Sequence, residues 1–371
     1  MSRFVQMHIL TAYPPSNPNR DDLGRPKTAV IGSVSRMRIS SQALKRAIRT
    51  DDAFRSALTG NLGERTQRMG DKVREYLLEK GASEDKALEI ARTIADLFGK
   101  VKGETTYIEQ LAFISPEERA AAFELAEQIL SGGVKIPEKE KGKDKGSPDT
   151  EKFVKEFAPK VLQTADGAVD VAMFGRMLAD NPDFNRDAAV QVAHAFTTNQ
   201  VDVEDDYYTA VDDLKTAEED AGAGFIGETG FGAGVFYLYI CVNRKLLLKN
   251  LSGDTELAGR ALSALVRAAA TASPSGKKNS FANHVRAEYL LLEHGDGQPR
   301  SLASAFTKPV RSDDQLGKSV EALKNQRTAF EKTYGKDWDA DKELHVHVGV
   351  EASATLDELA TFAAQGMESL A

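Results

Sequence analysis

The run VFYLYICVN at residues 235–243 constrains the fold more than any other part of the sequence. It is apolar on both faces of a strand, which is typical of a strand in the middle of a sheet that is covered on both sides. Near the N-terminus, residues 4–10 (FVQMHIL) alternate so that Val5, Met7 and Ile9 share one face, which predicts a second strand. The sheet is therefore expected to draw strands from both ends of the chain.

Between these strands the pattern is mostly helical. A helix is predicted from Ser40 or Ser41 to about Phe54, after a long loop that follows residue 10. Residues 61 to about 130 are helical throughout, with Pro116 at a helix start. Strands at both ends and a helical block between them predict an α+β fold with a large helical insertion. Further predicted elements are helices at 254–272 and 311–330 and strands at 284–293 and 345–350.

Two segments have little to bury. Residues 131–152 consist largely of Gly, Lys, Glu and Pro, which predicts a solvated or disordered loop. The acidic segment 200–224 runs into AGAGFIGETGFGAG, a glycine-rich stretch expected to project or to bend sharply.

The composition indicates a globular protein of the cytoplasm. No apolar run is long enough to cross a bilayer, and the N-terminal residues lack the pattern of a signal peptide. The single cysteine, Cys241, lies in an apolar strand and is expected to be a core residue.

The charge is unevenly distributed. The whole chain has a net charge of −8, which argues mildly against a general nucleic-acid binder. Residues 1–50, however, hold nine Lys and Arg against two Asp, whereas residues 202–220 hold nine acidic residues and one Lys. Because contact with phosphates depends on local charge, the N-terminal segment remains a candidate for nucleic-acid binding.

The predicted helix after Ser40 has a basic face. Leu44 and Ile48 lie on its opposite side, and Arg36, Arg38 and Ser40 precede its N-terminus, where backbone N–H groups favour an anion. Guanidinium and hydroxyl groups in this arrangement suit a phosphodiester backbone, although a solvated helix face is the simpler alternative. The face comprises Gln42, Lys45, Arg46 and Arg49, and Arg20, Arg25 and Lys27 lie on the preceding loop.

A second basic loop, SGKKNS at residues 275–280, offers Lys277 and Lys278. It can clamp a phosphate chain or be an ordinary surface loop, and the sequence favours neither.

Enzymatic alternatives have weaker support. His345 and His347 share a strand face but lack further metal ligands, so no metal site is expected there. GETGFGAG lacks the lysine of a phosphate-binding loop, and DVEDDYYTAVDD lacks the spacing of an EF-hand. No cofactor is predicted.

Five stretches of the sequence resemble a known family. The most specific is residues 8–50, HILTAYPPSNPNRDDLGRPKTAVIGSVSRMRISSQALKRAIRT. It resembles the N-terminal signature of the backbone subunit of type I-E CRISPR Cascade, the CasC or Cse-four family of the RAMP superfamily. The other four are DVAMFGRMLAD (170–180), VAHAFTTNQVDVEDDYYTAVDDL (192–214), GAGFIGETGFGAGVFYLYICVN (222–243) and QPRSLASAFTKPV (298–310).

The resemblance implies a fold shaped like a right hand. A palm resembling an RNA-recognition motif would comprise residues 1–60 and 227–371, helical fingers residues 61–190, and a projecting thumb residues 191–226. Copies of the chain would form a helical filament along the spacer of a CRISPR RNA (crRNA). Each thumb would displace one nucleotide at regular spacing, so that the guide is presented for pairing with target DNA. Other Cascade subunits would be further partners.

The resemblance also implies site residues. Arg20, Lys27, Ser40, Gln42, Lys45, Arg46 and Arg49 would contact the guide backbone, and Met177 would be an apolar wedge against a displaced base. Phe196 and Phe225, at the ends of the thumb, are weaker wedge candidates for which core packing is the alternative. Lys277 and Lys278 are assigned to the RNA by position and chemistry.

Two other functions stay open. Related type III backbone subunits cut RNA with a thumb aspartate, and this thumb is rich in acids. A metal-dependent RNA nuclease is therefore the main alternative, and an adaptor that contacts only protein is the weaker one. Because the resemblance is to the type I-E branch, no catalysis is expected. The acids in question are Asp202, Asp205, Asp206, Asp212 and Asp213.

Overall fold

The computed structural model describes residues 2–136, 148–162, 167–178, 181–210, 225–346 and 354–370. The chain divides into two compact units. The first, called here the sheet unit, comprises Met1–Ala57, Gln191–Arg244 and Leu262–Leu370. The second, the helical unit, comprises Leu58–Val190 and Lys245–Ala261. The helical insertion was predicted at 61–190, and the palm and thumb at the remaining residues.

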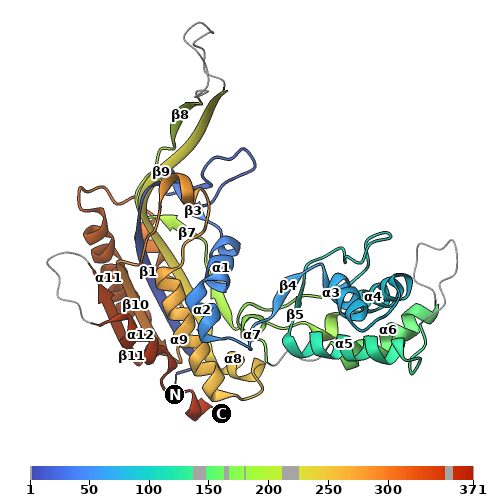
Figure 1. Cartoon of the computed structure of the whole chain (residues 1–371). Coiled ribbons are helices and arrows are strands. Elements are labelled where there is room, and N and C mark those ends of the chain that lie inside the picture. Colours follow the sequence, from blue (N-terminus) through green and yellow to red (C-terminus); the bar gives the residue numbers. More distant parts are fainter. Residues whose placement is uncertain are drawn as a thin grey trace, which may run out of the picture. The chain divides into compact units, whose positions relative to one another are not determined.

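The sheet unit is built on an antiparallel sheet with the strand order β11-β10-β1-β9-β7-β3-β2 (Figure 1). The central place of β9, between β1 and β7, confirms the prediction made from its apolar sequence. Cys241 in this strand is buried, as predicted. The strands are β1 (Phe4–Ser16), β2 (Thr28–Ile31), β3 (Val34–Ile39), β7 (Ala195–Thr197), β9 (Phe225–Asn243), β10 (Tyr289–Gly295) and β11 (Ala340–His345), while β6 (Val190–Val192) and β8 (Glu204–Ala210) lie off this path.

Helices cover the sheet on both faces. On one face, Ile39 and Leu238 of the sheet meet Leu44 of α1 (Ser41–Thr50) and Ala270 of α9 (Thr255–Thr271) around a cavity of about 30 Å³. On the other face, Tyr237 packs in a cluster with residues of α11 (Gln315–Tyr334). The remaining helices of this unit are α2 (Asp52–Ala57), α10 (Lys278–Phe281), η2 (Ala303–Phe306), α12 (Leu356–Ala364) and η3 (Glu368–Leu370).

The long loop predicted after residue 10 is wrong in part. β1 continues to Ser16, and β2 and β3 form a hairpin in which Ile31 pairs with Val34. The two residues of its turn, Gly32 and Ser33, have φ angles of 60° and 66°. Positive φ at both positions suits a tight turn that matches the twist of the flanking strands, which explains how so short a connection closes.

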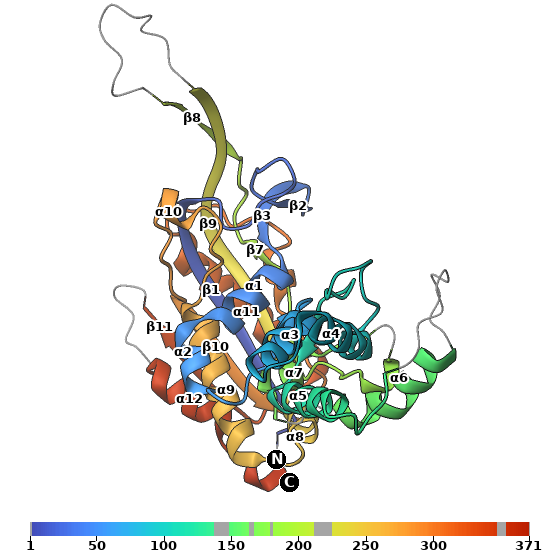
Figure 2. The same cartoon turned by 45° about the vertical axis from the view of Figure 1, so that its right-hand side comes forward.

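The first seven residues of β9 lie outside the main sheet and pair only with β8, from Glu204 opposite Phe231 to Ala210 opposite Phe225. We call this pair the ribbon (Figures 1 and 2). The glycine-rich stretch was expected to project or to bend sharply, and from residue 225 it is a regular strand. Gly227 leaves room for the Tyr208 ring, which a Cβ at this position would meet at 2.5 Å. Asp212 and Asp213 lie outside the described residues.

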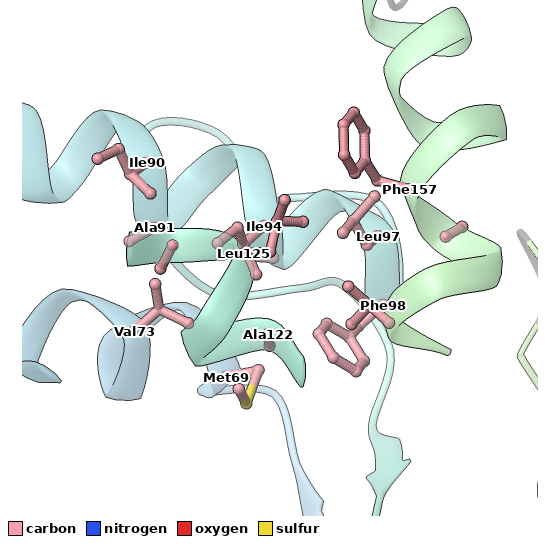
Figure 3. Packing of buried hydrophobic residues seen from close by; sticks show 14 of the residues in the cluster. Met69, Val73, Ile90, Ala91, Ile94, Leu97, Phe98, Ala122, Leu125 and Phe157 are labelled. Atoms are coloured by element: carbon pink, nitrogen blue, oxygen red, sulfur yellow. The ribbon is translucent and has the colours of Figure 1, made fainter. Parts of the chain in front are cut away.

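The helical unit is built around a core of its own. Met69, Ile90, Leu125 and Phe157, each from a different helix, belong to one buried cluster (Figure 3). A capping box at Ser115, with Pro116 in the first turn, begins α5 as predicted. The elements are β4 (Glu64–Thr66), α3 (Met69–Glu79), α4 (Glu84–Phe98), β5 (Ala112–Ile114), α5 (Pro116–Leu130), α6 (Pro148–Val161), α7 (Val169–Phe174) and η1 (Pro182–Phe184), while α8 (Arg244–Asn250) and α9 have residues in both units.

Other predicted boundaries shift by several residues. The helices predicted at 254–272 and 311–330 are α9 and α11, and the strand predicted at 284–293 is β10. The strand predicted at 345–350 overlaps β11 only at His345, and residues 347–350, including His347, lie outside the described part. Of the variable loop 131–152, residues 148–152 begin α6. None of the helices in the described residues has the length and apolar character needed to cross a membrane.

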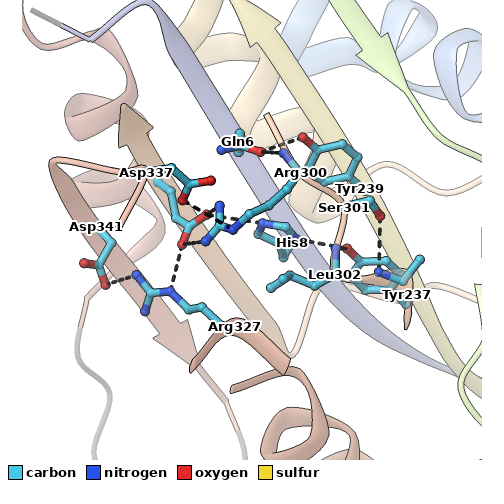
Figure 4. Close-up of polar contacts among 12 residues, drawn as sticks. Gln6, His8, Tyr237, Tyr239, Arg300, Ser301, Leu302, Arg327, Asp337 and Asp341 are labelled. Atoms are coloured by element: carbon cyan, nitrogen blue, oxygen red, sulfur yellow. Dashed lines mark hydrogen bonds and ion pairs between the residues drawn. The ribbon is translucent and has the colours of Figure 1, made fainter. Parts of the chain in front are cut away.

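A buried network of charges joins β1, β10 and α11 in the sheet unit (Figure 4). Glu293 accepts two hydrogen bonds from Arg300, at 2.9 and 3.0 Å, and one from Nε of Arg327 at 2.8 Å. Burial disfavours the ionised carboxylate, but the hydrogen bonds from His8 and Arg300 outweigh burial and lower the pKa of Glu293 to about 2. His8 is therefore a structural residue of this network, and its own pKa is lowered by burial.

Candidate nucleic-acid interface

Helix α1 presents the predicted basic face. Leu44 and Ile48 are buried, whereas Gln42 and Arg46 are exposed and Lys45 and Arg49 are half-buried. Ser40 caps the helix, and its Oγ accepts a hydrogen bond from the Ala43 amide at 3.3 Å. The helix ends at Thr50 and not near Phe54, because Asp51 is extended and its carboxylate caps α2.

Three segments of the sheet unit enclose a groove of about 660 Å³. They are the loop after β1, helix α1 and the loop that follows α9, so the structure brings together the two basic segments singled out in the sequence. Gly276 makes this possible, because a Cβ there would lie 2.3 Å from the Pro18 carbonyl oxygen. The basic residues lining the groove are Arg20, Arg46 and Lys278.

Carboxylates also line the groove. Two of them bind backbone amides. Asp21 accepts hydrogen bonds from the Leu23 and Arg25 amides, and Asp51 accepts one from the Phe54 amide. Asp22 and Asp52 line the groove as well. The groove therefore has mixed charge, and an anionic chain would have to follow its arginine and lysine side chains.

A second group of polar residues surrounds the N-terminus of α1. The Ser40 amide donates to Asn19 Oδ1 at 2.8 Å, which ties the loop after β1 to the helix start. Lys27 continues this loop, with its amide bonded to the Asn19 carbonyl. Lys45 is half-buried, and burial lowers its pKa. An anion that met Lys45 would favour its charged form and offset this effect.

Three basic residues of the N-terminal segment and the second loop contact groups of the protein itself. Arg36 is fully buried and donates to the carbonyls of Thr197, Thr198 and Phe306, so the expectation that it faces an anion is wrong. Arg25 pairs with Asp205 of the ribbon at 2.9 Å. Nζ of Lys278 lies 3.3 Å from Ser273 Oγ, while Lys277, with φ of 47°, directly precedes the short α10.

Met177, in the helical unit, is 76% exposed. Its neighbours are fixed: Arg176 donates to both carboxylate oxygens of Glu118, at 2.6 and 2.7 Å, and Leu178 is buried. The Met177 side chain is thus exposed between two neighbours that are anchored in the unit, a geometry that suits an apolar wedge.

The two aromatic candidates differ. Phe196 packs edge-on against Tyr237 and Phe306, with ring centroids 6.0 and 6.5 Å apart, which is the core packing that the sequence left open. Phe225 is 57% exposed at the end of the ribbon, where its ring contacts Tyr208. Phe225 therefore remains a candidate contact residue, and the structure gives Phe196 a role in the core.

The acidic residues of the described ribbon do not gather. In the described parts of the chain, no three or more His, Cys, Asp or Glu side chains are grouped as metal ligands would be. Asp205 is engaged by Arg25, and Asp206 is exposed on β8.

One residue that sequence reasoning missed is His194. It is a solitary histidine between alanines, with no spacing that marks it. The pairing of β3 with β7, in which Ile39 lies opposite Ala195, brings His194 beside the start of α1. Only knowledge of this strand register could have found it.

No curated protein sequence matches the chain significantly. A chain of a solved "CRISPR RNA-guided surveillance complex, pre-nicking" is 28% identical and has a TM-score of 0.80, with 97% of this chain and 99% of that chain covered. A chain of another "CRISPR RNA-guided surveillance complex" is 26% identical, with a TM-score of 0.58 and coverage of 96% and 92%. These matches confirm the relationship to subunits of CRISPR surveillance complexes. A model of the CT1975-like protein family matches residues 5–370, and the chain therefore belongs to the CT1975-like protein family.

Proposed function

We propose that this chain is the guide-binding backbone subunit of a CRISPR RNA-guided surveillance complex of the type I-E Cascade kind. The observation that carries the proposal is the groove of the sheet unit, where basic residues from three separate segments converge. The similarity to chains of two such complexes over nearly their full lengths supports it.

The groove suits recognition of a nucleic-acid backbone. Its arginine and lysine side chains provide charge and hydrogen-bond donors that match phosphate oxygens, and these contacts are independent of base sequence. Base pairing between guide and target DNA would then supply the specificity. The contact set we propose comprises the groove residues Arg20, Arg46 and Lys278 and, beyond the lining of the groove, Lys27, Ser40, Gln42, Lys45, Arg49 and Lys277.

In this proposal the sheet unit is an RNA-recognition-motif-like palm, the helical unit the fingers and the ribbon the thumb. Copies of the chain assemble along the crRNA spacer in the cytoplasm, together with other Cascade subunits. Met177 and Phe225 are exposed apolar groups that can receive bases next to a displaced nucleotide.

Guide retention tests the proposal. The protein is co-expressed with a CRISPR RNA, and the length of the RNA that copurifies is measured. The Lys45→Ala/Arg46→Ala double variant should lose this RNA. In binding assays its log affinity should depend less on log salt, by about 1.4, because each phosphate that is no longer neutralised lowers the slope by about 0.7.

A matched control removes two exposed lysines of α11, Lys318 and Lys332, and should retain RNA of uniform length. Unchanged RNA content and salt dependence in the K45A/R46A variant would refute RNA binding by this surface and favour an adaptor that contacts only protein.

We further propose that the chain is not a nuclease. A labelled RNA complementary to the bound guide should stay intact with magnesium. Cuts at regular spacing that disappear in a variant lacking the thumb aspartates would instead establish the metal-dependent nuclease.

A further inference from the structure

His194 lies where three elements of the sheet unit meet. It precedes β7, and its Nδ1 is 3.2 Å from NH1 of Arg38 on β3. The same Nδ1 lies 3.3 Å from the backbone nitrogen of Ser41, the first residue of α1. The imidazole itself is exposed at the surface that carries the proposed guide contacts.

These contacts define the protonation state of the ring. An arginine guanidinium and a backbone N–H can only donate, so Nδ1 must accept from both, and the ring proton lies on Nε2. The imidazole is therefore neutral. Its lone pair accepts from the Ser41 N–H, which lies at the N-terminus of α1 and would otherwise lack an intrahelical partner.

We infer that His194 is a positioning residue of the guide-binding surface, which as a neutral acceptor holds the Arg38 guanidinium and the first turn of α1 in place for the RNA backbone. The inference rests on the proposed function. The inference adds His194 to the residues that the binding surface needs. It also requires a neutral imidazole, whereas a histidine that contacted phosphate directly would act best as a cation.

The surroundings of His194 favour this neutral state. Although the residue is exposed, packing against its neighbours partly desolvates the ring, and this, followed by the positive charges of Arg38 on β3 and Lys27 on the loop before β2, lowers the pKa of His194 below its ordinary value of 6.5. From α1 the ring meets the Ser41 amide, the positive end of the helix dipole. Below the lowered pKa, protonation of Nδ1 removes the acceptor and places a cation against Arg38.

Three substitutions separate the roles of this side chain. In His194→Asn the amide oxygen can take the position of Nδ1, so the acceptor is kept without a titrating group. His194→Gln places its amide near Nε2 instead and loses the acceptor, as does His194→Ala. The full-length variants are titrated with a labelled oligouridylate, because its uracils do not ionise between pH 5 and pH 7.5 and the proposed contacts do not depend on sequence.

At pH 7.5 the Asn variant should bind within about twofold of the wild type, and the Gln and Ala variants about three- to tenfold more weakly, the range for loss of a side-chain hydrogen bond. Wild-type affinity should fall as the pH passes below the lowered pKa of His194, whereas the affinity of the Asn variant should stay level. Nitrogen-15 NMR of labelled histidine should show an unprotonated Nδ1 in the one imidazole whose signal the Asn variant lacks.

Other outcomes overturn the inference. Equal affinity of the wild type and all three variants would remove His194 from the binding surface. An equal loss in all three, accompanied by a lower melting temperature, would make its role merely structural. Tighter wild-type binding at low pH would identify a direct contact between an imidazolium and phosphate. Each of these outcomes leaves the proposed function intact, because that function fails only if the K45A/R46A variant binds RNA normally.

Discussion

At the scale of single residues, His294 is a buried base next to a fixed cation. It is 5% exposed, and its Nδ1 lies 3.3 Å from NH1 of Arg244. Burial and the Arg244 charge lower the pKa of His294 to about 4. Between pH 6.5 and pH 4 the unfolded chain therefore binds a proton at this residue that the folded chain does not, and stability falls as pH falls.

We expect this effect to cost about 3 kcal/mol of unfolding free energy between pH 6.5 and pH 4. Chemical denaturation at several pH values should show a shallower fall in a His294→Asn variant, which keeps an acceptor for Arg244 but does not titrate. Parallel curves for the wild type and the variant would contradict the assignment.

The Arg176–Glu118 pair makes a second prediction at this scale. Both side chains are almost fully buried, so Arg176→Ala leaves an unpaired carboxylate and should destabilise the helical unit by about 3–5 kcal/mol. Arg119→Ala removes a side chain that is 42% exposed and lies 3.6 Å from Glu64, and should cost less than about 1 kcal/mol. Hydrogen exchange of the amides of α5 measures the destabilisation caused by each substitution. Equal losses of protection in the two variants would count against the prediction.

Arg36 and Arg46 show how far single residues could be predicted. The sequence treats them alike, as basic residues close to one helix. In the structure Arg36 is buried among carbonyl groups and Arg46 lines the groove. Helical periodicity separated Arg46 from the apolar face of α1, but no local pattern reveals that carbonyls from β7 and η2 converge on Arg36.

At the scale of elements, the groove depends on the close approach of two loops at Gly276. Gly276→Ala forces the loop after α9 away from Pro18 and should cost about 1–3 kcal/mol, the range for overpacking. It should also weaken RNA binding by separating Lys278 from Arg20. Ser275→Ala, at a neighbouring exposed residue, is the control, and G276A with full stability and affinity would show that the loops need not touch.

Helices and central strands were predictable because burial repeats with a fixed period along the chain. The β2–β3 hairpin and the first part of β9 were not, because neither β2 nor the first part of β9 buries an apolar side chain. Their order comes from partners on other segments of the chain, such as Tyr208 for Gly227 and Arg25 for Glu228. The local sequence of such strands does not predict them, and they are recognised only from the strands with which they pair in the structure.

At the scale of the whole molecule, the exposed aromatic pair on the ribbon is expected to act between copies. Tyr208→Ala/Phe225→Ala should leave the melting temperature unchanged, because Phe225 is 57% exposed and Tyr208 44%. It should reduce the number of copies bound per RNA, measured by analytical ultracentrifugation. Tyr334→Ala, which removes an even more exposed aromatic residue from α11, should not. Full assembly of the Y208A/F225A variant would exclude these rings from contacts between copies.

The division of the chain was foreseen only in outline. Strands at both ends and helices between them indicated an insertion, and the sheet unit does combine three separate stretches of chain. That part of α9 belongs with the helical unit could not be predicted, because nothing in the sequence of a continuous helix shows which of its neighbours each turn will meet.

Strand β9 runs without interruption for 19 residues, from the end of the ribbon through the centre of the sheet. At about 3.3 Å per residue it measures roughly 60 Å. Because the ribbon and the sheet share this strand, the sheet fixes the direction of the ribbon, and the number of residues fixes how far the ribbon extends. Removing about two residues from each ribbon strand would shorten the ribbon by about 7 Å and turn no side chain to the wrong face, whereas removing a single residue from each would invert the faces beyond the cut. In an assembly whose copies are joined through the ribbon, the length of this one strand would determine the distance between neighbouring copies.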